Sequence, residues 1–381
     1  MQVILSVQSI HPPLTGIGRY AYELASRLST ASEISDLRFV NGARQVPHPD
    51  DQLNRPSMLR QLGRWVPFKL HARRAYHAAC NYYAEYQFRK LAPHYVYHEP
   101  NYILGEYSGP SIATIHDLSH IHYPEFHPSD RIDFLNRELP KTLDKAQHLI
   151  TVSEFVRQEM ISLLGIPPHR VTAIHNGVDS RFCPMTEEQT LPVRQKYGLA
   201  DARYLLVVAT LEPRKNLSRL LDAYMMLSSR IRQRHPLVLV GAKGWQDSEL
   251  NQRLHALLAN GMVRKLGYVD DIDLPALYAG AHAFAFPSLY EGFGLPVLEA
   301  IASGIPTLTS HCSSLPEVVG NSGVTINPLD VDALREGLVE LLENTSWREF
   351  ASQAGPLHAK QFSWEQCVQR TVDVYGHVAR L

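Results

Sequence analysis

Two glutamates flank a glycine-containing segment whose composition is typical of an anion-binding loop. The segment reads PSLYEGFGLPVLEA, follows a short apolar run and places Glu291 eight positions before Glu299. Gly292 and Gly294 allow the backbone to approach a ligand closely, and Pro296 suits the first turn of a helix, where its missing N–H removes no hydrogen bond. Free amides at the start of such a helix bind anions. We therefore expect a diphosphate-binding loop. An ordinary turn and helix start, with Glu299 in the first turn, is the alternative.

Two cations, Arg214 and Lys215, follow the apolar run 204–210, which we expect to be a strand. Side chains just after a strand of a parallel sheet stand at the edge where ligands bind. Two cations there can neutralise the charge that develops on a departing diphosphate, a contribution that is usually large in catalysis. An exposed, basic helix start is the alternative for the same residues.

A second glycine pair, Gly16 and Gly18, lies in the loop that we expect after the first apolar run, 2–7. The pair is too short for the G-x-G-x-x-G fingerprint of dinucleotide-binding proteins, because the third glycine is absent. This absence weighs against a nicotinamide-dependent oxidoreductase. The neighbouring Arg19 could add positive charge to a ligand site or be an ordinary surface residue.

His116 follows the apolar run 111–115 and begins a segment rich in possible metal ligands. These are His116, Asp117, His120 and His122. Two prolines interrupt the segment, so the sequence does not predict a helix that would carry two histidines with H-x-x-x-H spacing on one face. Asp271 and Asp273 form a D-x-D pair that suits a helix N-terminus better than a metal site. We expect no metal site, and a purely structural role for His116 stays an alternative.

Short apolar runs alternate with amphipathic stretches along the chain, a pattern that predicts parallel sheets covered by helices. The further runs expected as strands are 95–98, 148–152, 171–174, 237–240, 263–266, 283–286, 307–309 and 324–326. The segment 183–192 is rich in Pro, Glu and Thr, which predicts an interdomain linker. We expect an α/β chain of two Rossmann-like parallel-sheet domains, 1–185 and 193–362, that face an interdomain cleft.

The composition excludes several classes of protein. Of the 381 residues, 45% are hydrophobic and 20% charged, so the chain has the length of about two domains and lies far from the composition of disordered proteins. Its 37 Lys and Arg balance 38 Asp and Glu, so no global field attracts nucleic acid. Four cysteines without C-x-x-C spacing, and the lack of an export signal or of a long apolar run, favour the cytoplasm.

The stretch 55–90 combines positive charge with aromatic residues. Against the single acid Glu85 it holds the cations Arg55, Arg60, Arg64, Lys69, Arg73, Arg74, Arg89 and Lys90, interleaved with Trp65, Phe68, Tyr76, Tyr82, Tyr83 and Tyr86. Such a segment can rest on an anionic membrane or hold a phosphorylated lipid acceptor. Solvated helix faces with buried aromatics account for the same residues equally well. A peripheral contact with the inner face of the cytoplasmic membrane is therefore one of two interpretations.

Five motifs, taken in order, resemble those of the retaining glycosyltransferases of family 4, which have the two-Rossmann GT-B fold. They are TGIG at 15–18, TVSEF at 151–155, NGVD at 176–179, LEPRKN at 211–216 and the E-x7-E pair. The resemblance implies that Glu291 meets hydroxyls of the donor sugar and that Glu299 meets the nucleotide ribose. It also implies that Phe293, Gly294 and Leu295 offer backbone amides to the sugar and the diphosphate.

The resemblance extends to the other candidate residues. It implies that Lys215 contacts the phosphates, that the loop of Gly16 and Gly18 closes over the diphosphate and the acceptor, and that His116 contacts the donor sugar near the reacting carbon. Many members carry an arginine several residues before that lysine, where this chain has VAT at 208–210, so Arg214 is expected as its substitute. In this fold a final helix, here 363–381, crosses back to the first domain.

The resemblance also implies a particular class of donor and acceptor. The motifs look most like those of bacterial mannosyltransferases of O-antigen and surface-polysaccharide synthesis. This implies a nucleotide-sugar donor, GDP-mannose or a deoxy relative such as GDP-rhamnose, and a glycan or polyprenyl-diphosphate-linked acceptor. No cofactor and no metal are expected. The residues leave a UDP-sugar donor, or a nucleotide-sugar-binding protein without catalysis, as alternatives.

Overall fold

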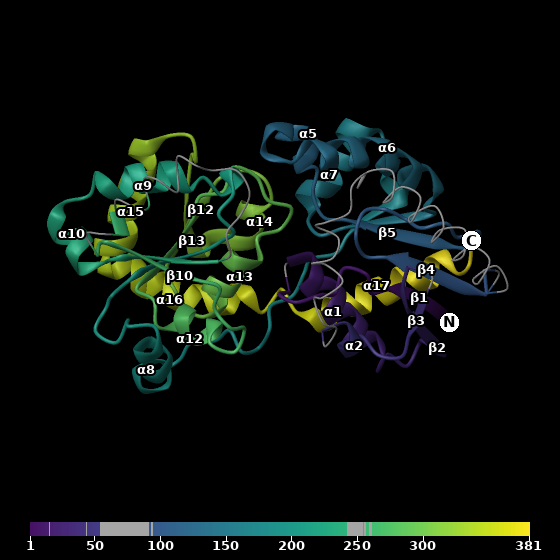
Figure 1. Cartoon of the computed structure of the whole chain (residues 1–381), viewed down its shortest axis with the longest axis horizontal. Helices are drawn as coiled ribbons and strands as arrows, with labels where there is room; N and C mark the ends of the chain where they lie inside the picture. Colours follow the sequence, from purple (N-terminus) through teal and green to yellow (C-terminus); the bar gives the residue numbers. More distant parts are fainter. Residues whose placement is uncertain are drawn as a thin grey trace, which may run out of the picture. The chain divides into compact units, whose positions relative to one another are not determined.

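The computed structural model describes residues 1–14, 16–42, 44–53, 91–92, 94–241, 254, 257–258 and 261–381. These residues form two compact units (Figure 1). The first unit comprises Met1–Asp117, Asp130–Asn176 and Trp364–Leu381, and the second comprises Leu118–Ser129 and Gly177–Ser363.

The first unit is built on a sheet with the strand order β3-β2-β1-β4-β5-β6-β7. The strands are β1 (Gln2–Ser6), β2 (Asp36–Asn41), β3 (Arg44–Val46), β4 (Tyr95–Glu99), β5 (Ser111–Ile115), β6 (His148–Thr151) and β7 (Val171–Ala173). All pairs are parallel except β2 with β3. Every residue of β4, β5 and β6 is buried, as expected for strands covered by helices on both faces.

Helices on the first sheet owe their bounds to capping and periodicity. They are α1 (Gly16–Leu28), α2 (Asp50–Leu53), α6 (Ser129–Lys145), α7 (Glu154–Leu164) and α17 (Trp364–Val378), with the 3₁₀ turn η2 (Pro168–Arg170). The hydroxyl of Ser153 accepts a hydrogen bond from the amide of Val156 at the start of α7, and Gly165 ends that helix in the left-handed conformation. The first of these signals, Ser153, lies within the TVSEF motif.

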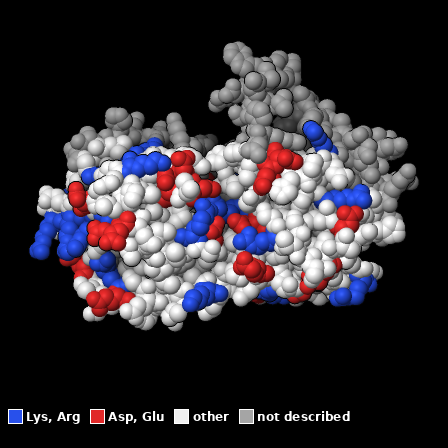
Figure 2. Space-filling model, turned by 90° about the horizontal axis from the view of Figure 1, so that it is seen from below, with Lys and Arg blue, Asp and Glu red and all other residues white. Residues whose placement is uncertain are grey.

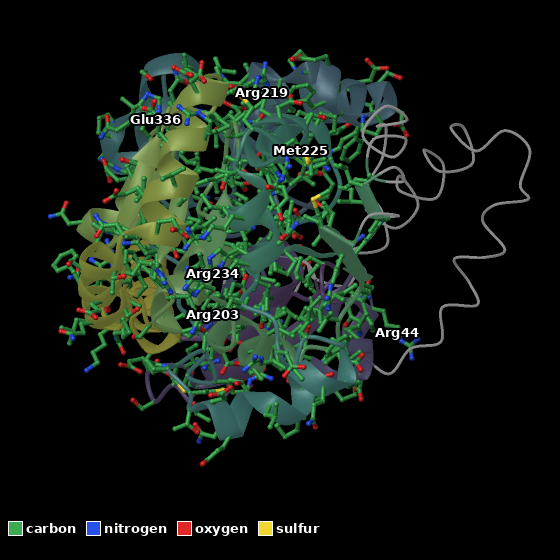
Figure 3. The ribbon with its side chains drawn as sticks, turned by 90° about the vertical axis from the view of Figure 1, so that its left-hand side faces the viewer. Arg44, Arg203, Arg219, Met225, Arg234 and Glu336 are labelled. Atoms are coloured by element: carbon green, nitrogen blue, oxygen red, sulfur yellow. The ribbon has the colours of Figure 1, made fainter. Side chains whose placement is uncertain are left out.

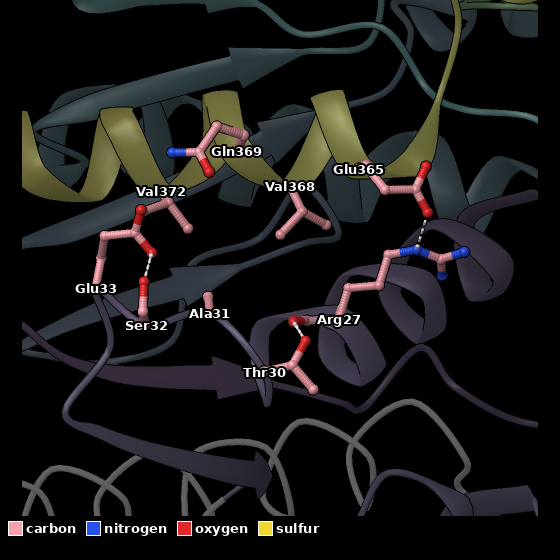
Figure 4. Close-up of a pocket in the computed structure, with 9 residues that line it drawn as sticks. All are labelled: Arg27, Thr30, Ala31, Ser32, Glu33, Glu365, Val368, Gln369 and Val372. Atoms are coloured by element: carbon pink, nitrogen blue, oxygen red, sulfur yellow. Dashed lines mark hydrogen bonds and ion pairs between the residues drawn. The ribbon is translucent and has the colours of Figure 1, made fainter.

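The C-terminal helix α17 belongs to the first unit and packs on α1. Its apolar stripe is buried and includes Cys367, Val368, Val372, Tyr375 and Val378. Figure 4 shows the edge of this contact, where a shallow pocket lies between the end of α1 and α17. There Nε of Arg27 donates to a carboxylate oxygen of Glu365 at 3.3 Å.

The second unit is built on an all-parallel sheet with the strand order β10-β9-β8-β11-β12-β13. The strands are β8 (Leu205–Val208), β9 (Leu237–Val240), β10 (Val263–Gly267), β11 (Ala283–Phe286), β12 (Thr307–Ser310) and β13 (Gly323–Ile326). The central strands are apolar and buried because helices cover both faces.

Connecting helices in the second unit are mostly short. They are α8 (Glu187–Lys196), α9 (Leu217–Met225), α10 (Ser229–Arg234), α12 (Leu274–Ala279), α13 (Leu295–Ala302), α14 (Leu315–Val319), α15 (Val331–Glu343) and α16 (Thr345–Ala359). The described residues of this unit also form the 3₁₀ turns η3 (Pro213–Lys215) and η4 (Gly320–Ser322). The segment 118–129, with α5 (Ser119–His122) and the 3₁₀ turn η1 (Pro124–Phe126), also belongs to this unit.

The expected linker at 183–192 is not a linker. Most of it forms α8, which begins with a capping box between Thr186 and Gln189 and packs on α12. Arg194 anchors the helix end because its guanidinium donates to the carbonyl oxygens of Leu199 and Ala200. The chain changes units earlier, between Asn176 and Gly177. The proline and acidic residues that suggested a linker belong instead to a capped surface helix.

Candidate active site

The strand order of the second unit defines one ligand-binding edge. From β8 the chain continues to β9 and β10 on one side of the sheet, and β11 then pairs with the other side of β8. Such a reversal opens a crevice at the carboxyl ends of the two strands. The segment after β8 holds Arg214 and Lys215 in η3, and the segment after β11 holds Glu291. The topology therefore brings these predicted residues to the same edge.

Four charged side chains form a compact cluster at that edge. Nζ of Lys215 donates to Oε1 of Glu291 at 2.6 Å, and Nη1 of Arg214 donates to Oε2 of Glu291 at 3.1 Å. The second guanidinium nitrogen, Nη2, donates to Oε1 of Glu212 at 2.9 Å. Nζ of Lys215 lies 3.9 Å from the same Glu212 oxygen. Two cations and two carboxylates thus balance in charge and hold one another in place.

Burial makes these ion pairs stronger than surface ones. The side chains of Lys215, Arg214, Glu291 and Glu212 are between 8% and 15% exposed. Burial alone raises the pKa of Glu291, but the charges of Arg214 and Lys215 outweigh it, so the pKa lies below its ordinary value. Lys215 also has its ammonium 5.1 Å from the ring centroid of Phe286. Glu291 is therefore a carboxylate at neutral pH.

Side chains from neighbouring loops fix the backbone around Glu291. The amide of Glu291 donates to Oγ of Ser313 at 3.1 Å, while Oγ of Ser314 donates to the carbonyl oxygens of Glu291 and Phe293. Asn216, with a left-handed φ of 58°, donates through Nδ2 to the carbonyl oxygen of Pro287 at 3.1 Å. The loops after β8, β11 and β12 are therefore tied into one rigid edge.

The start of α13 has the features expected of an anion site. Gly294 takes a φ of 108°, which lets the chain turn into the helix at Leu295. The N–H groups of Gly294 and Leu295 make no hydrogen bond within the part of the chain that the structure describes. Phe293 is buried beside Phe362. Glu299, 8% exposed, lies in the second turn of α13, so the interpretation that it complements the dipole in the first turn is wrong.

Gly16 and Gly18 differ from the sequence-based expectation. They do not form a loop, because α1 begins at Gly16 and both glycines lie in its first turn. The helix starts one turn before Tyr20, the first of its buried apolar residues Tyr20, Leu24 and Leu28. Gly18 is buried, and Gly16 is exposed. Their amides are thus helix N-terminal groups at the carboxyl edge of the first sheet.

His116 directly follows β5 at the carboxyl edge of the first sheet. Its Nε2 donates to the carbonyl oxygen of Pro100 at 2.7 Å, and its ring makes an edge contact with Tyr20. Burial lowers the pKa of His116, although the bond to Pro100 opposes this effect. A neutral ring with the proton on Nε2 leaves Nδ1 as an acceptor. His116 belongs to the first unit and Glu291 to the second.

Among the described residues, possible metal ligands are dispersed or serve structural roles. No group of three or more possible metal-ligating side chains lies together among the described residues. Asp273 accepts hydrogen bonds from Lys196 and Tyr197 at the start of α12. No described helix has the length and apolar character needed to cross a membrane. All eight cations of the basic stretch 55–90 lie outside the described residues.

A second group of cations lies at the opposite edge of the second sheet. Arg203 precedes β8 and Arg234 precedes β9, so both stand at amino ends of strands (Figure 3). Nη1 of Arg234 lies 3.8 Å from a carboxylate oxygen of Glu343. Acidic and basic side chains are also interspersed on the face drawn in Figure 2. The cluster around Glu291 therefore differs from these charged groups, because it lies at the carboxyl ends of the strands, where parallel sheets bind ligands.

Comparison with known proteins identifies the family. Residues 14–182 match the model described as Glycosyltransferase Family 4, and residues 191–358 match Glycosyl transferases group 1. The chain is 41% identical over 382 residues to O-antigen chain mannosyltransferase B of Escherichia coli, which covers 98% of this chain and 99% of that protein. The chain belongs to the family 4 glycosyltransferases. The resemblance carried by the five motifs is thereby confirmed.

Solved glycosyltransferases share the fold. WaaG, a glycosyltransferase involved in lipopolysaccharide biosynthesis, aligns with a TM-score of 0.71 at 15% identity over 98% of this chain and 99% of its own. Anabaena HepE, in a complex with UDP and glucose, aligns with a TM-score of 0.67 at 18% identity over 99% of this chain and 100% of its own. The predicted GT-B class with two parallel-sheet domains is confirmed.

Sequence reasoning missed three side chains of this glycosyltransferase's charged edge. Glu212 lies within the LEPRKN motif. Its negative charge beside the positive Arg214 and Lys215 could have indicated an ion pair. Asn216 ends the same motif, where asparagine is one of the residues that tolerate a left-handed conformation. Ser313 has no local signal, because its contact with Glu291 depends on the pairing of β11 with β12.

Proposed function

We propose that this glycosyltransferase transfers mannose, or a deoxy relative such as rhamnose, from a GDP-sugar to a hydroxyl of a glycan or lipid-linked glycan acceptor in bacterial O-antigen synthesis. The observation that carries the proposal is the buried cluster of Arg214, Lys215 and Glu291 at the carboxyl ends of β8 and β11. The mannosyltransferase relative, similar over its whole length, supports the choice of sugar and acceptor class.

Stabilisation of the leaving group is the main catalytic contribution of this edge. The bond between the anomeric carbon and the diphosphate oxygen breaks, and the nucleoside diphosphate leaves with increased negative charge. Arg214 and Lys215 neutralise that charge together with the amides of Gly294 and Leu295, in a site shielded from water. A fixed pair of cations does here what a divalent ion does in metal-dependent transferases. We therefore propose a metal-independent reaction.

Glu291 has a second task once the donor is bound. In the free protein its carboxylate holds both cations. When the diphosphate takes over these cations, the carboxylate can accept hydrogen bonds from hydroxyls of the donor sugar. Glu299 meets the ribose, and His116 accepts a sugar hydroxyl at its Nδ1. These contacts orient the sugar as it passes through an oxocarbenium-like state.

Retention of configuration follows from attack on the same face as departure. The acceptor hydroxyl forms the new bond to the anomeric carbon, and its proton goes to the departing phosphate oxygen. No protein nucleophile is required in this route. A covalent adduct on Glu291, as formed in retaining glycosidases, is the alternative.

A transfer assay tests the proposal. Purified protein is given GDP-mannose, GDP-rhamnose, UDP-glucose and UDP-galactose in turn, with a mannose-terminated, lipid-linked oligosaccharide, in buffer with and without EDTA. We expect transfer from a GDP-sugar only, unchanged by EDTA, with the anomeric configuration of the donor kept in the product by NMR. Transfer from a UDP-sugar would overturn the donor assignment. Nucleotide binding by calorimetry without any transfer would favour a non-catalytic binding protein.

The basic, aromatic stretch 55–90 supports a peripheral contact with membrane lipid. A lipid-linked acceptor lies at a membrane surface, and eight cations against one acid would draw the chain to anionic headgroups. Sedimentation with vesicles that contain phosphatidylglycerol tests this part. Reversal of four of these cations to Glu should abolish co-sedimentation, whereas equal sedimentation of both forms would refute the contact.

A further inference from the structure

A buried acid that the proposed mechanism does not use stands at the ligand-binding edge of the first unit. In the strand order of this sheet, β1 continues to β2 on one side, and β4 pairs with the other side of β1. The crevice of this reversal therefore lies at the carboxyl ends of β1 and β4. Ser6 is the last residue of β1, and Glu99 is the last residue of β4.

Each unit thus carries an acid at or beyond the carboxyl end of the strand across its reversal. Glu291 follows β11, which pairs across the reversal with β8, as β4 pairs with β1. Glu291 is held by Arg214 and Lys215. Glu99 makes no ion pair within the part of the chain that the structure describes, and it is bonded instead by a neutral group, because the hydroxyl of Tyr97 donates to its Oε2 at 3.2 Å. The two acids therefore have different electrostatic environments.

Glu99 is 6% exposed, and this burial decides its protonation. Burial raises the pKa of Glu99 to about 7, although hydrogen bonds from Ser6, Tyr97 and the backbone of Asn101 lower it in part. A buried carboxylate without a cation is poorly compensated, so it gains from a further hydrogen-bond donor. A hydroxyl group is such a donor and brings no charge.

The neighbouring strand places His116 at the same edge. The residue after Glu99, Pro100, accepts the hydrogen bond from Nε2 of His116 through its carbonyl oxygen at 2.7 Å. β4 and β5 are paired, with Glu99 opposite Ala113. His98, which precedes Glu99, is turned to the interior and bonds Tyr375 and Thr114. Glu99 and His116 are thus the titratable side chains that end these two adjacent strands.

We propose that Glu99 binds a hydroxyl group of the sugar acceptor as a hydrogen-bond acceptor. This inference rests on the proposed function. The two oxygens of a carboxylate offer about four acceptor sites, so Glu99 can keep its bonds from Ser6, Tyr97 and Asn101 and still take one from the acceptor. Its position after β4 separates it from the diphosphate site after β8 and β11, which belongs to the other unit. Glu99 therefore acts on the acceptor and leaves binding of the diphosphate to the second unit.

The substitution Glu99→Gln tests the proposal, with Glu106→Gln as the matched control. Both remove one negative charge from the first unit, but Glu106 is an exposed acid paired with Lys145. We expect Glu99→Gln to lower kcat/KM for the acceptor at least about tenfold, which is the effect of losing a hydrogen bond to a charged group. The Kd of the nucleotide and the slow hydrolysis of the donor in the absence of acceptor should stay within twofold. Glu106→Gln should change none of these.

A pH profile adds a readout that a merely structural role would not move. For the wild type, kcat/KM for the acceptor should rise with pH through about 7, as Glu99 ionises. The other groups around it titrate elsewhere: the pKa of His98 is about 3, that of His116 is lowered, and that of Tyr97 is well above its ordinary value. In Glu99→Gln this rise should disappear.

The outcomes distinguish a failure of the Glu99 assignment from a failure of the proposed function. If the wild type transfers no sugar from any donor, the proposed function fails. If the wild type transfers sugar while Glu99→Gln matches it in acceptor kcat/KM and pH profile, only the role of Glu99 is overturned. An equal loss of donor hydrolysis and acceptor transfer would also overturn it, because the variant would then have damaged the site as a whole. Circular dichroism of both variants establishes that they are folded.

Discussion

At the scale of single residues, the decisive feature is a lysine and an arginine that share one buried carboxylate. Lys215→Ala leaves Glu291 with one cation and the diphosphate with one fewer donor. We expect kcat/KM for transfer to fall about a hundredfold or more, the usual loss when a group that stabilises developing charge is removed. The matched control is Lys360→Ala, because Lys360 is exposed on the same unit. A loss of less than fivefold in steady-state assays would contradict the assignment of Lys215.

The raised pKa of Glu99 predicts an unusual pH dependence of the free energy of unfolding. In the unfolded chain its pKa is near 4.5, whereas in the folded protein it is about 7. Below pH 4.5 both states bind the proton, and between pH 4.5 and 7 the unfolded state loses it first. The free energy of unfolding therefore falls over this interval, by about 3 kcal/mol in all. Glu99→Gln should remove the decline, so its Tm relative to wild type should be higher at pH 8 than at pH 4.5.

The control for this prediction is again Glu106→Gln, whose difference in Tm from wild type should be similar at both pH values. If Glu99→Gln is no more stabilising at pH 8 than at pH 4.5, burial does not raise the pKa of this carboxyl group. A group that costs stability at neutral pH and sits at a ligand-binding edge is typical of function rather than of folding. The stability measurement and the acceptor kinetics therefore bear on the same side chain independently.

At the scale of elements, the sequence predicted the strands and the residues that follow their carboxyl ends. Each run expected as a strand exists, because a strand covered on both faces must be apolar throughout. The positions of Arg214, Lys215 and Glu291 just after β8 and β11 followed from that. The sequence could not predict that Ser313 supports Glu291, since this contact depends on which strands are neighbours. It also missed β2, whose half-buried residues lack a continuous apolar run.

Gly294 joins the Glu291 loop to α13, and its positive φ disfavours any side chain at this position. Its φ is 108°, and a Cβ there would lie 2.8 Å from Cδ2 of Leu315. Gly294→Ala should therefore displace the amides at the start of α13 and weaken nucleotide binding about tenfold or more, measured by calorimetry. The matched control is Gly198→Ala, whose φ is 68° and whose Cβ would meet no atom within 4 Å.

Gly198→Ala should lower stability by about 1 kcal/mol and leave the nucleotide Kd unchanged, because only the left-handed conformation is disfavoured there. The pair of variants separates backbone strain from loss of the anion site. Equal nucleotide affinity in the two variants would show that the start of α13 does not bind the diphosphate. Equal loss of stability without loss of affinity would assign Gly294 to folding alone.

At the scale of the whole molecule, the proposed diphosphate site and the proposed acceptor contact of Glu99 belong to different units, and the chain passes between the units more than once. The first unit is completed by the last helix of the chain, and the second includes the segment 118–129 from within the first half. The resemblance predicted the return of the last helix, and the structure confirms it. A simple division of the sequence at a linker could not have predicted the placement of the segment 118–129, because that placement depends on packing between distant segments. The folding of each unit therefore requires residues from both halves of the chain.

This division predicts that the two units respond separately to perturbation. Tyr375 of α17 and His98 of β4 share a hydrogen bond of 2.7 Å in the core of the first unit. Tyr375→Phe should leave the ring nitrogen of His98 without a partner, a loss of about 1–3 kcal/mol. Amide hydrogen exchange in β4 and β5 should then accelerate about tenfold or more, while exchange in β8 and β11 stays as in the wild type.

Nucleotide binding should have the opposite effect, because it should slow amide hydrogen exchange in the second unit. On the proposed function GDP binds the folded second unit, so saturating GDP should slow exchange in the segments 205–216 and 283–302 and leave β4 and β5 unchanged. The same protection should appear in Tyr375→Phe, because that variant leaves Arg214, Lys215 and Glu291 intact. Hydrogen-exchange mass spectrometry of the wild type and the variant, each with and without GDP, measures all four states. Faster exchange in both units of the variant would show that they unfold as one, and protection confined to the first unit would place the nucleotide there and refute the donor site at Glu291.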